Sequence, residues 1–470
     1  MASYSPNTPS LVEIPGERKN PIEWFRSLQP HQRNRLVLFG TGVIVLLVLG
    51  LLFWLPGNRV SQQQTIIEFW DVFDDYNAYG ELINKYQSQN PGVTIRYAKK
   101  EFETYRNEVL NGLASGSGPD VYAIHNTWLP VEQSRLAAMN DAYQPQHVAE
   151  VIATYPDVVR FDFVREDPRS GVHNVYAIPL SIDTLGLYYH TGYFNSANIL
   201  EAPATWDEFV ADVKTLRRVN ANGEVQVAGV AMGSAGNVNR ATDILSLLML
   251  QGGTRMNNPE RDEVTFHFTA SNSPAVPGLD ALMFYTSFSD PSSENYTWDR
   301  NGIYSIDAFA EGRAAMMVNY SFQRATIRSK APNLQFAIAP IPQPASQFER
   351  INYANYWGLG VAKASEHTDE AWKFINFLQQ EENARVYLAR TGRPAALRAL
   401  ANSQLGDEEL GPFASQVLTA KSWVQGDARE AEPIMQEMIS ATLVDRSRAR
   451  AELVRAVNRI NVIMDKLFNS

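Results

Sequence analysis

One uncharged apolar stretch constrains this chain more than any other feature of its sequence. It runs from Leu36 to Leu55 and contains a single hydroxyl side chain, Thr41. At the rise of an α-helix these residues span roughly 30 Å, about the thickness of the hydrocarbon core of a bilayer. We therefore expect a single transmembrane helix over residues 36–55.

The charges around this stretch predict which side of the membrane each end of the chain occupies. Five basic residues precede it, namely Arg18, Lys19, Arg26, Arg33 and Arg35, whereas Arg59 is the only base close behind it. Basic flanks stay in the cytoplasm. A cleaved secretory signal is the alternative, but no small-residue cleavage site follows the stretch. We expect a single-pass plasma-membrane protein with a cytoplasmic N-terminus and an extracytoplasmic remainder.

The segments on either side of the stretch carry little that could fold alone. Residues 1–35 hold five prolines among polar residues and show no sustained periodicity, so we expect a disordered cytoplasmic tail. Residues 56–64 are polar and short, which is typical of a linker. The linker would keep the folded part near the membrane surface.

The composition of the remaining chain limits its partners and its chemistry. Residues 61–470 carry 35 basic and 48 acidic residues, which argues against nucleic acid as a partner. The chain has no cysteine, which excludes disulfides, thiol catalysis and zinc–thiolate sites. More than 400 residues are too many for one ordinary core, so we expect two lobes. We also expect a monomer.

From residue 65 onward the sequence alternates between strand and helix patterns. TIIEFW (65–70), VTIRY (93–97) and VYAI (121–124) are typical of buried strands. Apolar residues at helical spacing follow the first strand, and a second helix is predicted over 102–114. Strands joined through helices by short loops predict an α/β fold with a parallel sheet.

Further sequence blocks follow in a fixed order. They are GPDVYAI (118–124), YAIPLSIDTLGLYYHTGYF (176–194), PATWDEFVADVKTL (203–216), FAEGRAAMMVNYSF (309–322), FAIAPIPQ (336–343), YWGLGVAKASEHTDEAWKFINFL (356–378) and TGRP (391–394). Together they resemble the extracellular solute-binding proteins of ABC importers, the family that includes maltose-binding protein. One departure is Tyr189, His190 and Thr191, where the family carries an aromatic residue, Asn and Lys.

The resemblance implies a two-lobed fold of the type II periplasmic-binding-protein class, with a ligand cleft between the lobes. We expect the chain to cross between lobes near 181–185, 357–361 and 405–410. The first lobe would then comprise residues 65–181 and 361–408, and the second lobe residues 185–356 and 412–470.

Aromatic and polar side chains gather where the expected strands end, which is where open α/β sheets bind ligands. Flat aromatic faces pack on sugar rings while carboxylates and amides bind hydroxyl groups, so a carbohydrate is the expected ligand. The candidate ligand-binding residues are Trp70, Asp71, Asp74, Asn126, Trp128, Asp183, Tyr320, Phe322, Tyr356 and Trp357.

Several of these residues also have a purely structural explanation. Trp70 ends a strand and is compatible with a place in the core. Asp71, Asp74 and Asp75 could cap the next helix. Asp183 is harder to explain by packing, because a carboxylate follows an apolar strand at an expected crossing between lobes.

No enzyme motif accompanies these residues. GSAG (233–236) is not a nucleophile elbow, SGSGPD (115–120) lacks the lysine of a P-loop, and the histidines show no metal-binding spacing. We expect no catalytic residue, no metal and no cofactor.

The sequence thus predicts a membrane-anchored substrate-binding protein of an ABC importer that delivers a mono- or oligosaccharide to permease subunits. One alternative is an anchored solute sensor or scaffold with the same fold. Another is an anchored glycosidase, for which Asp183 with one acid of residues 71–75 is the available carboxylate pair.

Overall fold

The computed structural model describes residues 20–54, 64–140, 145–167, 169–270, 273–345 and 349–468. The chain divides into two compact units, Met1–Gln63 and Gln64–Ser470. Most of the predicted tail up to residue 19, Leu55 at the end of the predicted transmembrane helix, and residues 56–63 of the predicted linker lie outside the described residues.

The first unit consists of two helices, α1 (Pro21–Ser27) and α2 (Pro30–Trp54). The Asn20 side chain caps α1 by accepting a hydrogen bond from the Ile22 backbone N–H, and a proline occupies the first helical position. The expectation of disorder therefore fails for residues 21–27 and 30–35, which are helical. For residues 21–27 the Asn20 cap accounts for the helix without a buried core.

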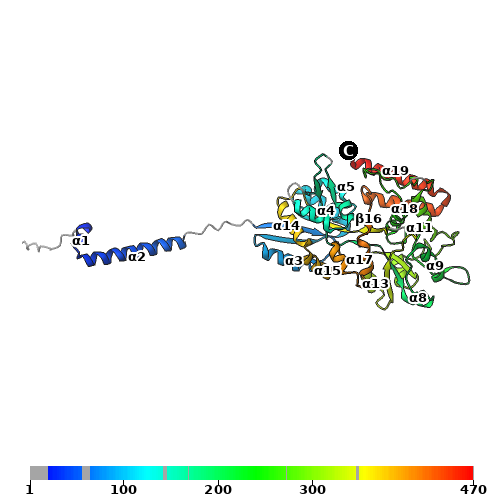
Figure 1. Cartoon of the computed structure of the whole chain (residues 1–470), viewed down its shortest axis with the longest axis horizontal. Helices are drawn as coiled ribbons and strands as arrows, with labels where there is room; N and C mark the ends of the chain where they lie inside the picture. The colour runs from blue at the N-terminus through cyan, green and yellow to red at the C-terminus, as the bar shows by residue number, and fades with distance from the viewer. Residues whose placement is uncertain are drawn as a thin grey trace, which may run out of the picture. The chain divides into compact units, whose positions relative to one another are not determined.

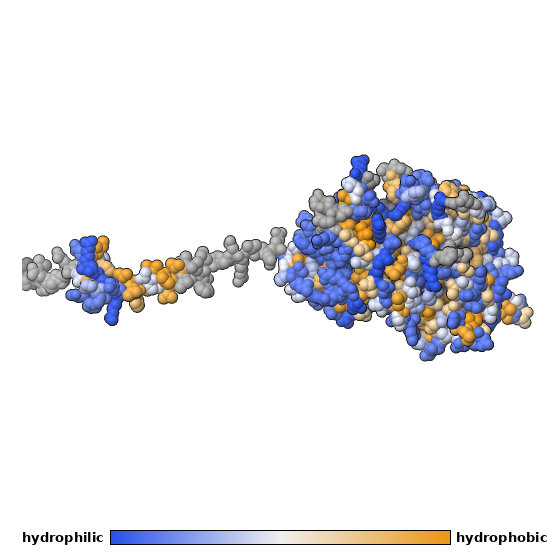
Figure 2. All heavy atoms as spheres, viewed as in Figure 1, coloured by the Kyte–Doolittle hydropathy of each residue, from blue (hydrophilic) through white to orange (hydrophobic). Residues whose placement is uncertain are grey.

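Apolar side chains are exposed along α2, among them Leu38, Phe39 and Leu46, and Figure 2 shows this part of the helix in orange. Within the part of the chain that the structure describes, no helix is long and apolar enough to cross a membrane.

A five-stranded sheet with the order β2-β1-β3-β15-β7 forms the first lobe of the second unit (Figure 1). The strands β1 (Thr65–Asp71), β2 (Val93–Lys99) and β3 (Val121–His125) are parallel, as predicted. The strand β15 (Trp357–Val361) pairs antiparallel with β3, and β7 (Ile178–Pro179) pairs antiparallel with β15 at the edge of the sheet. The crossover helices are α3 (Tyr76–Gln89) and α4 (Phe102–Ser115).

Short elements and later helices complete the first lobe around a core that includes Ile67, Phe69 and Phe374. Because strand side chains alternate, Ile67 and Phe69 share one buried face, and Phe69 packs on Phe374 of α14. These elements are α5 (Leu129–Glu132), η1 (Gln133–Arg135), β4 (Met139–Asn140), α6 (Pro145–Thr154), α7 (Asp157–Phe163), β5 (Val164–Glu166), β6 (His173–Val175), α14 (Thr368–Gln379), α15 (Glu381–Thr391) and α16 (Arg398–Ser403).

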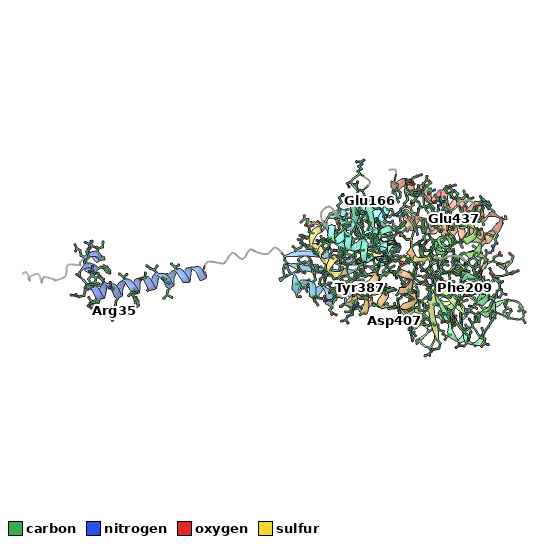
Figure 3. The ribbon with its side chains drawn as sticks, viewed as in Figure 1. Arg35, Glu166, Phe209, Tyr387, Asp407 and Glu437 are labelled. Atoms are coloured by element: carbon green, nitrogen blue, oxygen red, sulfur yellow. The ribbon has the colours of Figure 1, made fainter. Side chains whose placement is uncertain are left out.

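The second lobe has an antiparallel sheet with the order β12-β9-β13, made of β12 (Met316–Asn319), β9 (Gly186–His190) and β13 (Phe336–Pro340). Its helix α9 (Trp206–Leu216) begins with a capping box of Thr205 and Glu208. The other elements are α8 (Thr191–Ser196), β10 (Arg218–Val219), β11 (Val225–Val227), α10 (Ala241–Gln251), α11 (Pro277–Ser287), α12 (Ser305–Ala310), α13 (Gln323–Lys330) and α17 (Gly411–Val417). Phe209 of α9 and Tyr387 of α15, both labelled in Figure 3, lie in different lobes.

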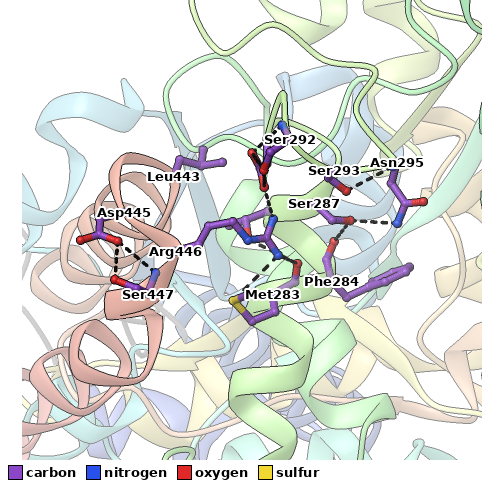
Figure 4. Close-up of polar contacts among 12 residues, drawn as sticks. Met283, Phe284, Ser287, Ser292, Ser293, Asn295, Leu443, Asp445, Arg446 and Ser447 are labelled. Atoms are coloured by element: carbon purple, nitrogen blue, oxygen red, sulfur yellow. Dashed lines mark hydrogen bonds and ion pairs between the residues drawn. The ribbon is translucent and has the colours of Figure 1, made fainter.

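The chain ends in α18 (Ala428–Val444), η2 (Arg446–Arg448) and α19 (Ala449–Phe468). Apolar residues at helical spacing along α19, among them Leu453, Val457 and Ile460, are buried in the core of the second lobe. Arg446 ties these helices to α11 (Figure 4). Its guanidinium donates to the Asp290 carboxylate at 2.7 Å and to the Met283 carbonyl at 3.2 Å.

Two separate cores show where the chain passes between lobes. Ile182 belongs to the core of the first lobe and Leu185 to that of the second, whereas Tyr353 belongs to the second and Ala354 to the first. A small sheet with the order β16-β14-β8 joins the crossing segments, and Figure 1 shows β16 and α17 between the lobes. Its strands are β8 (Asp183–Thr184), β14 (Asn352–Asn355) and β16 (Ala420–Lys421). The predicted lobe boundaries themselves stay predictions.

Candidate ligand-binding cleft

Three aromatic side chains, Phe73, Phe102 and Trp357, gather at the edge of the first-lobe sheet where the parallel strands end. Phe73 and Phe102 stack with ring centroids 5.7 Å apart, and Trp357 meets Phe73 edge to face at 5.5 Å. Phe73 is 46% exposed and Phe102 is 50% exposed. We call these three residues the first-lobe aromatic wall, and the exposed rings of Phe73 and Phe102 can stack on a ligand.

Two further residues support this wall from behind. Trp128 is buried and meets Trp357 edge to face, with ring centroids 4.8 Å apart. His125, at the end of β3, lies 5.4 Å from Trp357 between ring centroids, and its Nδ1 is 2.8 Å from the Thr127 hydroxyl. Burial lowers the pKa of His125 to about 4, and the positive charge of Arg240 contributes. His125 is therefore neutral at physiological pH.

A second aromatic pair follows β12 in the second lobe. Tyr320 and Phe322 stack with ring centroids 5.9 Å apart, and Phe322 is 50% exposed. The buried Tyr320 hydroxyl donates to the Asp243 carboxylate at 2.7 Å. Asp243 also accepts from Arg240 Nε at 2.8 Å, so the two opposite charges at the start of α10 are paired. We call Tyr320 and Phe322 the second-lobe aromatic pair.

A pocket of about 50 Å³ lies between the lobes beside these aromatic groups. Its walls come from the first lobe, from the start of α10 and from the crossing strand β14. The lining residues are His125, Thr127, Arg240, Thr242, Asp243, Ser246, Tyr353, Ala354, Asn355, Trp423, Gln425, Ala428, Glu432 and Met435. Burial and Asp243 raise the pKa of Glu432. With His125 neutral and Arg240 paired, the pocket offers many hydrogen-bonding groups and little net charge.

Asp183, a predicted ligand contact, binds protein groups of the second lobe. Its carboxylate accepts hydrogen bonds from the Ser321 hydroxyl at 2.7 Å and from the Ser321 backbone N–H at 3.0 Å. The Thr184 backbone N–H also donates to it, at 2.9 Å. Burial raises the pKa of Asp183 to about 6. These contacts hold β8 against the segment that carries the second-lobe aromatic pair.

Asp71 and Asp74 lie in a buried network of the first lobe. The Tyr79 hydroxyl donates to Asp71 at 2.8 Å, and Asp74 accepts from Tyr387 and Arg393, each at 2.7 Å. Burial raises the pKa of Asp71 to about 6, and the neighbouring charge of Asp74 adds to the effect. Both carboxylates therefore have protein partners that join β1, α3 and α15.

Asn126 and Tyr356 meet at a third buried carboxylate, that of Asp162. The Tyr356 hydroxyl donates to Asp162 at 2.6 Å and the Asn126 amide donates at 3.1 Å, while the Ser422 hydroxyl also donates. Burial raises the pKa of Asp162 to about 6. The Asn126 side-chain oxygen is buried and has no hydrogen-bond partner in the structure.

Trp70 lies apart from the other candidates. Because side chains alternate along β1, it points to the face opposite Ile67 and Phe69, where the Lys100 ammonium sits 3.7 Å from its ring centroid. Of the ten predicted residues, the structure thus brings Trp128 to Trp357, Tyr320 to Phe322 and Asn126 to Tyr356. Whether each contacts a ligand stays a prediction.

Sequence patterns missed Phe102, Arg240 and Asp243 as cleft residues. The signal for Phe102 was its position directly after β2, which ends at the same sheet edge as β1. Arg240 carried no such signal, since only the fold brings it to the end of β3. Among the described residues, no cluster of three or more His, Asp or Glu could hold a metal ion.

Comparison with known proteins agrees with this geometry. A family model described as bacterial extracellular solute-binding protein matches residues 70–385. The chain belongs to this family. The resemblance inferred from the ordered sequence blocks and the two-lobed fold is thereby confirmed.

Two relatives found by sequence comparison carry the names of binding proteins. A protein of Brucella abortus (strain 2308) named "putative binding protein" is 23% identical over 316 residues, which cover 65% of this chain and 69% of the relative. The multiple sugar-binding protein of Streptococcus mutans is 23% identical over 255 residues, which cover 53% of this chain and 57% of the relative.

Solved structures share the fold at lower identity. The sugar-binding protein MalE from Xanthomonas citri has a TM-score of 0.70 at 20% identity, with 86% of this chain and 98% of that chain covered. A solute-binding protein of Thermotoga lettingae bound with α-D-tagatose has a TM-score of 0.63 at 17% identity, with 85% and 100% covered. These solute-binding proteins have the same two-lobed α/β architecture.

Proposed function

We propose that this solute-binding protein captures an uncharged sugar between its lobes. The observation that carries the proposal is the first-lobe aromatic wall of Phe73, Phe102 and Trp357. Two of its rings, Phe73 and Phe102, are exposed, and Trp357 contacts His125, which lines a polar pocket of low net charge. Aromatic faces pack on the C–H faces of sugar rings, and neutral donors and acceptors bind their hydroxyl groups. Names of its relatives, a multiple sugar-binding protein among them, support the same ligand class.

The two lobes account for how capture could be signalled to a partner. The pocket takes side chains from both lobes and from the crossing strand β14, so a ligand there contacts both halves at once. Such a ligand stabilises the closed arrangement by its higher affinity for that arrangement. The closed, loaded protein would then deliver the sugar to the permease subunits of an ABC importer.

The protein would release its sugar unchanged. For the glycosidase alternative, Asp183 and one acid of residues 71–75 would have to serve as a catalytic pair. Yet Asp183 accepts hydrogen bonds from Ser321, Asp74 is paired with Arg393, and Asp75 is paired with Lys99. Partners of this kind leave no free carboxylate pair among these residues for acid and base roles.

We also propose that residues 36–55 anchor the protein in the plasma membrane, with the N-terminus in the cytoplasm. Support comes from the uncharged apolar sequence and from the five bases that precede it. Alkaline extraction of membranes would leave an anchored chain in the pellet and release a peripheral one. Protease added to intact cells should then digest residues 64–470 and spare the N-terminal segment.

The ligand is tested by thermal unfolding of the full chain in detergent micelles with a panel of sugars that includes tagatose, maltose and maltotriose. A sugar present at a hundred times its dissociation constant should add about 2.7 kcal/mol to the free energy of unfolding. Chromatography of the recovered sugar separates binding from hydrolysis. A shift with intact sugar supports the proposal, hydrolysed sugar supports the glycosidase, and no shift with any sugar favours the sensor or scaffold.

A further inference from the structure

A second cavity, of about 890 Å³, opens between the lobes. Residues 418–425, one of the segments that cross between the lobes, line both this cavity and the pocket of the cleft. Consecutive residues of this segment line different spaces: Ser422 lines the second cavity, whereas Trp423 lines the pocket of the cleft. The same alternation repeats at Val424 and Gln425. The two spaces therefore lie on opposite faces of one extended segment, and we call the second one the back cavity.

Two arginines, one from each lobe, meet in the back cavity. Arg165 of β5 donates to the Phe161 carbonyl at 2.8 Å, and Arg261 of the second lobe donates to the same carbonyl at 3.2 Å. The guanidinium of Arg261 also lies over the Phe161 ring, 3.9 Å from its centroid. Both arginines donate to one oxygen atom, so the distance between their Nη1 atoms cannot exceed the sum of the two hydrogen-bond lengths. The two guanidinium charges are therefore close neighbours.

Neither of these guanidinium groups has an ion pair with a carboxylate of the described residues. Most of the acids that line the back cavity already have a basic partner. Glu349 pairs with Lys421, Asp157 pairs with Arg398, and Glu166 lies 3.8 Å from His173. Among the described residues, three arginines that line the cavity, Arg160, Arg165 and Arg261, have no ion pair with a carboxylate. Glu260 is the one lining acid of the described chain that likewise has no ion pair. Unpaired positive charge therefore accumulates here in a chain whose net charge is −10.

Burial and backbone strain set these arginines apart from ordinary surface bases. Burial lowers the pKa of Arg165, and the charge of Arg261 lowers it further, while Asp162 opposes both effects. Arg261 adopts a φ of 65°, a left-handed conformation that is unfavourable for a residue with a side chain. The chain thus holds two like charges together at a cost, which an oxyanion bound between them would offset.

We propose that the back cavity binds a small organic oxyanion, whose carboxylate or phosphate group is held by Arg165 and Arg261. Guanidinium groups match the planar, bidentate geometry of such oxyanions better than lysine does. The cavity volume suits a metabolite-sized ligand, and Phe161, Val164 and Leu418 supply apolar surface for its carbon skeleton. This site does not depend on the identity of the ligand in the cleft.

Because each lobe contributes one arginine, the anion is sensitive to the relative position of the lobes. A ligand that changes this position from the cleft side must change the affinity of the anion, and the anion must change the affinity of that ligand by the same factor. The back cavity would therefore link the binding activity to a charged metabolite.

The test is isothermal titration calorimetry of the full chain in detergent micelles, with inorganic phosphate and citrate as separate probes. We expect saturable one-site binding of at least one probe. Binding of phosphate alone identifies a phosphate ligand, binding of citrate alone identifies a carboxylate ligand, and binding of both identifies the shared oxyanion chemistry. Absence of saturable binding with both probes would overturn the proposal.

Arginine variants test whether the anion binds at Arg165 and Arg261. Arg261→Gln should weaken binding about tenfold or more, and Arg261→Lys, which keeps the charge but loses the fork, should weaken it less. Arg300→Gln is the matched control, because Arg300 also donates to a backbone carbonyl, that of Leu443 at 2.9 Å, away from the back cavity. Equal weakening by Arg300→Gln and Arg261→Gln would overturn the assignment, and Arg165→Gln serves as a second site variant if it folds.

Discussion

Asp183, on the strand where the chain first passes between lobes, accepts hydrogen bonds from both the hydroxyl and the backbone N–H of Ser321. The two residues are far apart in sequence, and Ser321 stands between the members of the second-lobe aromatic pair. One carboxylate therefore fixes the position of a cleft wall relative to the crossing strand.

Replacing this carboxylate should destabilise the protein. Asp183→Ala leaves the buried Ser321 hydroxyl and N–H without an acceptor, which should lower the free energy of unfolding by about 2 kcal/mol. Ser321→Ala removes the hydroxyl alone and should cost about 1 kcal/mol. Urea unfolding of both variants and of the double variant measures the coupling. Strict additivity of the two effects would show that the pair does not act as a unit.

Removing an aromatic face from the first-lobe aromatic wall should weaken sugar binding. Phe73→Ala deletes a ring that is 46% exposed, so the fold should tolerate it while a stacked sugar loses its platform. We expect the affinity for a sugar found in the panel to fall by about tenfold to a hundredfold, as calorimetry would measure. Phe268→Ala is the control, because Phe268 is 55% exposed and lines neither cavity. Equal losses from both variants would remove the case for stacking.

How far the sequence predicts this molecule depends on whether the signal is local. The strands β1, β2 and β3 and their crossover helices were predicted to within a few residues, because each follows from its own apolar spacing. The capping box of Thr205 and Glu208 was also readable, since both partners lie within one turn.

The candidate site was less predictable because its partners are distant in sequence. Asp183 was expected near a passage between lobes, yet no pattern in the sequence predicts that Ser321 will bind its carboxylate. Asp74 was read as a cap or a ligand contact, whereas Arg393 and Tyr387 arrive from α15 and its following loop. Polar side chains after strands thus predict where a site lies better than which groups remain free to bind a ligand.

The buried carboxylate of Asp162 should make stability depend on pH in an uncommon direction. Its pKa is raised from the ordinary value of 3.8 to about 6, so the folded protein binds this proton more tightly than the unfolded chain does. The contribution of Asp162 to stability is therefore fully present below about pH 4 and is lost as the pH rises through about 6. Two pKa units correspond to at most about 3 kcal/mol.

Asp162→Asn isolates this effect from the other titrating groups. The amide cannot lose a proton, so the difference in unfolding free energy between the variant and the parent should change between pH 4 and pH 6 and be flat outside that range. Urea unfolding across this pH range measures the difference. A constant difference would mean that Asp162 has the same pKa in the folded and unfolded chains.

Arg106 should act as an ionic link between the lobes. Its guanidinium donates to Glu132 of the first lobe and to Asp427 at the start of α18, each at 2.9 Å. Arg106→Gln leaves the buried Glu132 carboxylate without this partner, which should cost about 3 kcal/mol of unfolding free energy. Adding Glu132→Gln removes the stranded charge and should recover part of the loss. If the double variant is no more stable than Arg106→Gln, an unpaired charge is not the cause.

Gly229 should be intolerant of any side chain, for a reason that lies in the packing of α9. A Cβ placed there would lie 2.8 Å from the carbonyl carbon of Val213 and closer still to its oxygen, and this backbone belongs to a buried helix turn that cannot yield. Gly229→Ala should therefore lower the free energy of unfolding by about 2 kcal/mol or more. Gly236→Ala is the control, because a Cβ at Gly236 meets nothing within 4 Å and both glycines lie in the same loop region before α10. Thermal unfolding should separate the two variants clearly, and similar melting temperatures would show that the Val213 turn can move aside.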